Sequence, residues 1–177
     1  MDSLDGYVSD DELAVPPLSR LGYQVETVSW RSTDTDWSEF DIVVIRTPWD
    51  YQNEPERFLR VLAEIESSGT RLENPLSLAK WNFDKRYLFD FERRGIPIVP
   101  TLWGEGEFTG DDVANWLTNL DTREAVIKPT VSATAQDTFR LTGYDPEVAA
   151  RFRERSYMVQ PFVQSIVDEG EYSVFYF

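Results

Sequence analysis

The chain has 177 residues, neither cysteine nor histidine, and a formal net charge of −15 at pH 7. It can therefore form no disulfide, no Cys- or His-ligated zinc site and no Ser-His or Cys-His catalytic pair, so any metal must be bound through oxygen, which favours magnesium. The excess of 32 Asp and Glu over 17 Lys and Arg repels a phosphate backbone, and we expect no nucleic-acid partner.

Hydropathy and charge also bear on the environment of the protein. No stretch has the long uncharged apolar run of a membrane span, and the N-terminus lacks the regions of a signal peptide, so we expect a soluble, cytoplasmic protein without a membrane partner. The acidic excess fits a halophile with a high-salt cytoplasm, and it fits an ordinary acidic protein equally well.

Residues 1–73 predict part of a parallel α/β layer. Capping residues, periodicity and prolines predict a helix at 9–22 that a proline pair interrupts or kinks, a strand at 23–30, a strand at 40–45 and a helix at 54–68. The strand at 40–45 has the dense apolar composition of a parallel strand covered on both faces, and Arg46 follows at its carboxyl end. Ligands of open α/β sheets bind at this end of the strands, so Arg46 is a candidate site residue.

Residues 74–101 predict a turn, a capped helix and a strand, with a lysine at the start of the helix. Asn82 is the expected N-cap, Lys85 lies in the first turn, and 96–99 is the expected buried strand. Lysine is rare in this chain, at three residues against fourteen arginines. A lysine at this position therefore suggests a specific role, although a solvated surface lysine is the simpler alternative.

A second lysine, Lys128, ends a β-branched run and precedes a stretch of small residues. Ser132, Ala133 and Thr134 in that stretch would let backbone N–H groups approach a phosphate, whose charge Lys128 could neutralise. The glycine-rich pattern of well-known phosphate loops is missing, so a plain surface loop is the alternative. The elements predicted after residue 101 are a helix opened at 109–112, a strand at 125–128, its hairpin partner at 138–141, a helix at 145–155, and strands at 157–160 and 171–177.

Taken in order, these features resemble the ATP-grasp superfamily. The resemblance rests on the two lysines, on Gln-Pro-Phe-Val at 160–163 and on Gly-Glu-Tyr-Ser-Val at 170–174. Within the superfamily, Arg-Thr-Pro-Trp-Asp-Tyr at 46–51 and Lys-Trp-Asn-Phe-Asp-Lys at 80–85 are similar to the branch of glutathione synthetase and of the cyclo-ligase of cycloserine biosynthesis.

The resemblance implies an α/β fold in three parts. They are a pre-ATP-grasp parallel α/β domain on the substrate side at 1–73, the N-terminal ATP-grasp subdomain at 74–159, and an adenine linker with the start of the C-terminal subdomain at 160–177. Relatives begin with a strand that would precede this sequence, and they carry acidic and Asn magnesium ligands in a part that would follow it. We therefore expect the chain as given to be an inactive fragment.

The resemblance also implies roles for individual residues. Lys85 and Lys128 would contact the nucleotide phosphates, and the loop from Ser132 through Ala133 and Thr134 to Gln136 would close over them. The other implied nucleotide contacts are backbone groups of Gln160, Phe162 and Val163 at the adenine edge, and Glu171, or its near neighbour Glu169, at the ribose hydroxyls. Arg46 could bind a substrate carboxylate. Alternatively, Arg46 pairs internally with Asp50, and Trp49 belongs to the core.

The implied function is that of an ATP-dependent carboxylate-amine ligase or cyclo-ligase with ATP and Mg²⁺ as cofactors. A substrate carboxylate would attack the γ-phosphate to give an acyl phosphate and ADP, after which an amine would displace the phosphate. The expected partners are ATP and small-molecule carboxylate and amine substrates, and a homo-oligomer stays open. The alternative is a non-catalytic nucleotide-binding or interaction remnant of an ATP-grasp protein.

Overall fold

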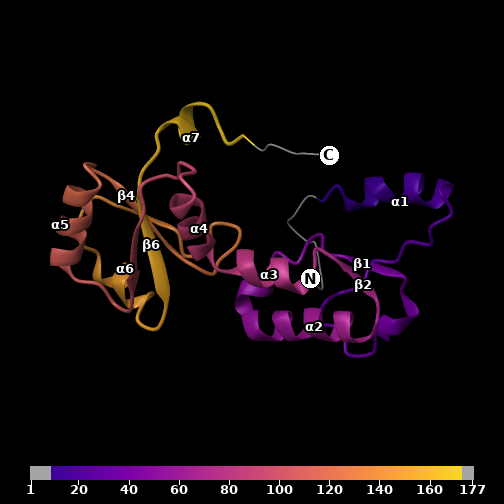
Figure 1. Ribbon diagram of the computed structural model, residues 1–177. Helices are drawn as coiled ribbons and strands as arrows, with labels where there is room; N and C mark the ends of the chain where they lie inside the picture. Colours follow the sequence, from indigo (N-terminus) through magenta and orange to yellow (C-terminus); the bar gives the residue numbers. More distant parts are fainter. Residues whose placement is uncertain (1–8, 173–177) are drawn as a thin grey trace. The chain divides into compact units, whose positions relative to one another are not determined.

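The computed structural model describes residues 9–172, and the chain divides into two compact units, Met1–Asp84 and Lys85–Phe177. Each unit has its own sheet (Figure 1) and its own hydrophobic core. None of the helices in the described part combines the length and the apolarity that crossing a bilayer requires.

The first unit is built on two parallel strands, β1 (Ile42–Val44) and β2 (Arg71–Glu73), with Val43 opposite Leu72. Its helical elements are α1 (Asp11–Arg20), η1 (Trp37–Glu39), η2 (Tyr51–Asn53), α2 (Pro55–Ser67) and α3 (Leu76–Phe83). Helix α2 connects the two strands, as parallel pairing requires. The unit therefore contains a strand–helix–strand motif, and the predicted parallel α/β character is confirmed.

Helix α2 provides most of the core of the first unit. Phe58, Val61, Leu62 and Ile65 recur at helical spacing and are buried, and the ring of Trp30 meets that of Phe58 edge-on at 5.4 Å. Burial of side chains of this size contributes about 1.5–3 kcal/mol each. One face of the sheet is thereby fixed against one helix.

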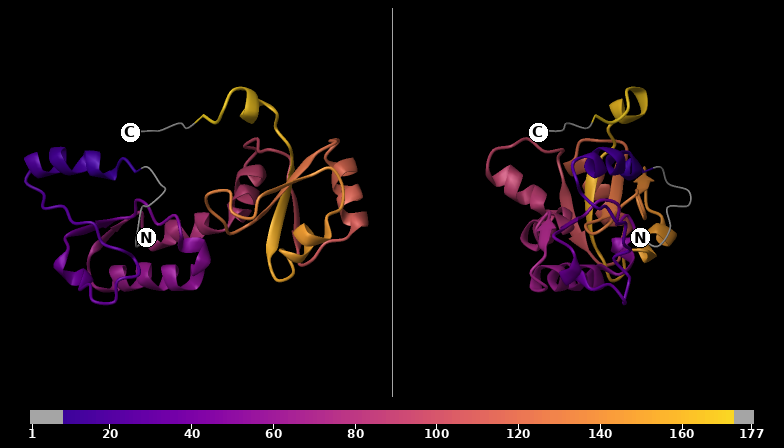
Figure 2. Two further views of the ribbon diagram at one scale, coloured as in Figure 1. Left: turned by 180° about the vertical axis from the view of Figure 1, so that it is seen from behind. Right: turned by 90° about the vertical axis from the view of Figure 1, so that its right-hand side faces the viewer.

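The other face of the sheet is less covered than the sequence predicts. Ile42 and Val44 are 38% and 51% exposed, so the prediction of a strand covered on both faces is wrong. Helix α1 lies on that side, across the strands from α2 (Figures 1 and 2), yet it buries no residue. Pro16 and Pro17 do not interrupt this helix, because water can replace the lost N–H donors in an exposed helix.

Residues 23–30 form no strand, since β1 and β2 are the only strands of this sheet among residues 9–172 and neither pairs with them. A strand gains its stability from a hydrogen-bonded neighbour and not from alternation alone.

The second unit contains an antiparallel sheet in the order β3-β6-β4-β5 within the described residues. Its strands are β3 (Leu102–Glu105), β4 (Ala125–Pro129), β5 (Phe139–Leu141) and β6 (Ser156–Pro161). Its helical elements are η3 (Lys85–Tyr87), α4 (Leu88–Arg93), α5 (Gly110–Asn119), α6 (Pro146–Ala150) and α7 (Ser165–Asp168). Helices α5 and α6 lie on one side of β4 and β6, and α4 lies on the other (Figures 1 and 2).

The predicted starts of two helices in the second unit are confirmed, and each has a side-chain cap. Thr109 caps α5 through a reciprocal capping box with Asp112, and Asp145 caps α6 through the backbone N–H groups of Glu147 and Val148. The hairpin of β4 and β5 is also present, with Ile127 opposite Phe139.

The boundaries around the first lysine differ from the prediction. Asn82 lies inside α3 instead of capping a helix, and Lys85 opens the short turn η3. No strand forms at 96–99, because Pro97 and Pro100 remove donors from a sheet ladder; the strand starts at Leu102 instead. Of the strand predicted at 171–177, the first two residues have no regular structure and the rest lie outside the described residues.

Candidate functional site

Strand alternation places Lys128 on the face of the sheet that is opposite the main core. Ala125, Ile127 and Pro129 are buried, and Ala125 and Ile127 belong to the core cluster with α5 and α6. Lys128 therefore projects to the other face, where its cross-strand neighbour is Met158. That face carries a half-buried cation in the middle of a sheet.

The electrostatics of Lys128 follow from this position. Burial lowers the pKa of Lys128 below its ordinary value, and the negative charge of Glu171 partly opposes the shift. Glu171 itself is exposed. The structure thus places the negative charge of Glu171 close enough to Lys128 to affect its pKa, although the two residues lie far apart in the sequence.

Lys85 contacts the loop that follows Lys128. Its Nζ donates to the carbonyl oxygen of Ser132 at 2.7 Å, to Ser132 Oγ at 2.8 Å and to the carbonyl oxygen of Thr130 at 3.4 Å. Ser132 is buried, and its hydroxyl donates to the carbonyl oxygen of Pro129 at 3.2 Å. Lys85 therefore binds the small-residue loop directly, and Lys128 lies on the strand that leads into this loop.

The loop between β4 and β5 has an unusual backbone. Thr134, Ala135 and Asp137 all have positive φ, at 53°, 57° and 52°, which costs energy for residues other than glycine and is tolerated best by Asn and Asp. The exposed Thr134 and Ala135 are therefore held in a conformation that needs support from outside the loop.

Asp137 supplies that support, and the sequence analysis missed it. Its carboxylate accepts from Arg151 at 2.7 Å and from Arg155 at 2.5 Å, and only 8% of its side chain is exposed. Burial alone would raise the pKa of Asp137, but the hydrogen bonds from Arg155 and Arg151 outweigh it and hold this pKa below its ordinary value. Nothing in the local sequence signals the pairing, because the partners lie 14 and 18 residues away.

The predicted adenine linker leaves the sheet at the end of β6. Gln160 is still paired in β6, and its side-chain amide donates to Thr101 Oγ1 at 2.9 Å. The N–H of Phe162 donates to the carbonyl oxygen of Glu124 at 2.9 Å, and Arg140 stacks on the Phe162 ring at 3.6 Å. Val163 follows, with its carbonyl accepting from Ile166, and Glu169 ends the short helix α7.

In the first unit, Arg46 lies at the carboxyl end of β1 and is exposed. Its Nε donates to Asp11 at 2.8 Å. The alternative pairing with Asp50 is wrong, since Asp50 accepts from Trp30 Nε1 at 2.9 Å and pairs with Arg31. Burial would raise the pKa of Asp50, but the hydrogen bonds from Trp30 and Arg31 outweigh it and lower this pKa.

Both the sequence and the fold have counterparts among known proteins. Residues 1–74 match the family model described as D-cycloserine synthetase DcsG, N-terminal domain. The chain is 33% identical over 175 residues to the cycloserine biosynthesis protein DcsG of Streptomyces lavendulae, covering 92% of this chain and 58% of that protein. The crystal structure of D-cycloserine synthetase DcsG superimposes with a TM-score of 0.76 at 29% identity, covering 91% of this chain and 57% of that one.

The predicted resemblance to the ATP-grasp superfamily, in the branch of cycloserine biosynthesis, is confirmed. A RimK domain ATP-grasp protein from Sphaerobacter thermophilus shares the fold, with a TM-score of 0.63 at 18% identity, over 92% of this chain and 62% of that one. The predicted α/β fold class, with a parallel layer followed by an ATP-grasp subdomain, is confirmed. The chain spans 58% of the length of DcsG.

ATP-grasp ligases are ATP-dependent, and the residues of the second unit are chemically suited to a polyphosphate. Two ammonium groups, small side chains and backbone N–H groups around one loop are the donors that phosphate oxygens prefer. For magnesium the picture differs. Among residues 9–172, no group of three or more Asp or Glu side chains is placed to hold a metal ion.

Proposed function

We propose that the second unit binds ATP on the face of β4 and β6 that carries Lys128, as the nucleotide-binding part of an ATP-dependent ligase. The observation that carries the proposal is the contact of Lys85 with the loop at Ser132, which follows the strand that carries Lys128. The family supports the general activity, since its members are ATP-grasp ligases. Because the chain spans 58% of DcsG, we propose the ligase activity for the whole protein and nucleotide contacts for this part of it.

The two lysines would have different tasks. The half-buried Lys128 would meet a phosphate oxygen without moving, and the incoming negative charge would compensate for its lost hydration. Lys85 would exchange the oxygens of Ser132 for phosphate oxygens, which frees the loop from its present anchor. Ser132, Ala133 and Thr134 would then supply backbone N–H groups around the phosphates.

The base and the ribose would bind where the chain leaves β6. The Phe162 N–H is already donated to Glu124, so we propose that the N–H of Val163 and backbone groups of Gln160 read the adenine edge. We assign the ribose hydroxyls to Glu171, whose charge reaches Lys128, with Glu169 as the neighbouring alternative.

The reaction we propose is activation of a carboxylate as an acyl phosphate, followed by attack of an amine. The relatives carry the names cycloserine biosynthesis protein and D-cycloserine synthetase, so a ring-closing ligation is the version of this chemistry that we favour. Arg46 would bind the substrate carboxylate after releasing Asp11, as a guanidinium binds a carboxylate in a bidentate manner. Bound magnesium would neutralise the triphosphate, and we assign no ligand of it to this chain.

Titration calorimetry with ATP tests the nucleotide site on the purified chain, with and without magnesium. We expect Lys85→Met and Lys128→Met each to weaken ATP binding by about tenfold or more, because each removes a charged hydrogen bond to phosphate. Lys80→Met is the matched control, since Lys80 is an exposed lysine of α3 in the other unit. ATP affinity that is unchanged in both site variants would refute the proposal.

A further inference from the structure

Glu124, Arg140 and Phe162 form a cluster at the end of β6, which we call the linker clamp. Ala125 lies opposite Pro161 in the sheet, and the N–H of Phe162 donates to the carbonyl oxygen of Glu124 at 2.9 Å, which extends the ladder beyond the strands. The carboxylate of Glu124 accepts from Nε and Nη2 of Arg140, both at 2.7 Å. The Arg140 guanidinium in turn lies 3.6 Å from the centroid of the Phe162 ring. One backbone bond, one bidentate ion pair and one cation–π contact thus connect three separate segments of the chain.

The clamp lies on the face of the sheet that carries Lys128. Val126 shares that face, because it lies two positions before Lys128 on the same strand. Arg140 on β5 and Gln160 on β6 are the register partners of Val126 and therefore point to the same side. The clamp accordingly borders the surface on which we place the nucleotide, at the end where the base would bind.

The segment 160–163, which we call the linker, is restrained at three points. The side-chain amide of Gln160 donates to Thr101 Oγ1 at 2.9 Å, and the carbonyl oxygen of Val163 accepts from the N–H of Ile166 at 3.2 Å. The clamp holds Phe162, which lies between these two contacts. The positions of the backbone groups of Gln160 and Val163 therefore depend on the clamp as well as on their own contacts.

Stability alone does not account for this arrangement. The side chains of Arg140 and Glu124 are 51% and 28% exposed, and ion pairs at such positions contribute little to the free energy of unfolding. A bidentate pair does fix the plane of the guanidinium group, and a stacked guanidinium fixes the ring beneath it. The clamp is therefore better suited to orienting Phe162 than to stabilising the sheet.

We propose that the linker clamp is a positioning device for base recognition, and that Arg140 is the positioning residue that sets the preference for adenine over guanine. The proposal rests on the nucleotide site proposed above. Adenine presents a donor at N6, where guanine presents the acceptor O6. Backbone groups held at fixed positions match one of these patterns and oppose the other, whereas a mobile linker can adapt to both. Loss of the clamp should therefore reduce base discrimination and leave the phosphate contacts unchanged.

Amide hydrogen exchange in the ¹⁵N-labelled full chain tests the clamp without nucleotide. Arg140→Met should speed exchange of the Phe162 N–H by about threefold, as expected from the loss of one cation–π contact, and should leave exchange at Ile127 in β4 unchanged. Arg123→Met is the matched control, because it removes an exposed arginine next to Glu124. Unaltered exchange at Phe162, or equally faster exchange at Ile127, would overturn the proposal.

Titration calorimetry with ATP, GTP and tripolyphosphate tests the consequence for recognition. In Arg140→Met the ratio of the GTP to the ATP dissociation constant should fall by about threefold, while tripolyphosphate affinity stays at the wild-type value. Arg140→Lys should also lower the ratio, since lysine keeps the charge but lacks the planar fork. Lys128→Met should weaken all three ligands without changing the ratio.

The outcomes separate this proposal from the nucleotide site on which it rests. A wild-type GTP to ATP ratio in Arg140→Met, together with weaker ATP binding in Lys128→Met, would overturn the role of the clamp and leave the nucleotide site standing. Wild-type ATP affinity in Lys85→Met and Lys128→Met would refute the nucleotide site, and the clamp proposal with it.

Discussion

Replacing the carboxylate of Asp137 by an amide should destabilise the second unit by about 2 kcal/mol. The side chain of Asp137 is 8% exposed and accepts from two arginines, so Asp137→Asn leaves two guanidinium groups without their counterion. A shielded hydrogen bond to a charged group contributes about 1.5–3 kcal/mol to the free energy of unfolding. We assign such a contribution to Arg155, reduced for solvent screening because its side chain is 36% exposed. Arg151 is 62% exposed and adds about 0–1 kcal/mol.

Urea denaturation of Asp137→Asn and wild type at neutral pH measures this difference. Asparagine is the right replacement because it tolerates the positive φ of 52°, so the backbone contributes little to the change. Glu154→Gln is the control: it also removes one negative charge next to Arg155, but from an exposed position. A loss of stability in Asp137→Asn that is no larger than in the control would refute the reasoning.

The pH dependence gives a second check with a fixed sign. The pKa of Asp137 is lowered in the folded state, so its contribution is fully present above the ordinary value of 3.8 and is lost as the pH falls through the folded-state value. The gap between wild type and Asp137→Asn should therefore shrink when the pH drops below 3.8. A gap that stays constant into this range would mean that the charge is not the cause.

Three further changes have defined outcomes. Thr109→Ala should cost about 1 kcal/mol in urea denaturation by removing the cap of α5, while Thr118→Ala, within the same helix, should cost less. Lys128→Met should weaken ATP binding and should raise the melting temperature at neutral pH, because it removes a half-buried charge. This increase in melting temperature should shrink as the pH rises toward 10.5, since wild-type Lys128 then loses its proton. If the −15 charge is a high-salt adaptation, molar salt should raise the melting temperature, whereas a flat or falling curve would exclude that origin.

The sequence was most informative where one residue acts on its immediate neighbours. The helix starts near Thr109 and Asp145 and the hairpin around the small-residue loop were predicted because the residues that signal them lie within a few positions. Strand boundaries were less predictable, since the prolines around 96–99 outweigh an apolar run. Short β2 also escaped prediction, because a three-residue strand has too little periodicity to recognise.

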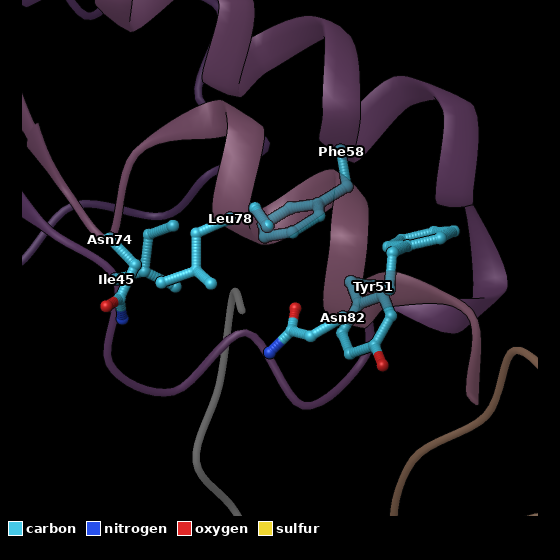
Figure 3. A pocket seen from close by; sticks show the side chains of 8 residues that line it. Ile45, Tyr51, Phe58, Asn74, Leu78 and Asn82 are labelled. Atoms are coloured by element: carbon cyan, nitrogen blue, oxygen red, sulfur yellow. The ribbon is translucent and has the colours of Figure 1, made fainter. Parts of the chain in front are cut away.

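The candidate site could be predicted only in part. Lys85, Lys128 and the loop at Ser132 were named from their positions in the sequence and their roles from the resemblance, and their nucleotide contacts stay a prediction. The ion pairs of Asp137 and Asp50 depend on contacts between distant segments, which a single sequence does not encode locally. The same limit applies to the pocket of the first unit that Figure 3 shows, since its lining comes from separate elements that only the fold brings together.

Two separate cores have a consequence for how this protein should be measured. The cluster around Phe58 and Leu62 and the cluster around Phe108 and Ile127 share no residue. Calorimetry should accordingly resolve two melting transitions, so one unfolding free energy for the whole chain has no clear meaning. The first unit, with one sheet face exposed at Ile42 and Val44, should melt at the lower temperature, and each substitution should move only the transition of its own unit.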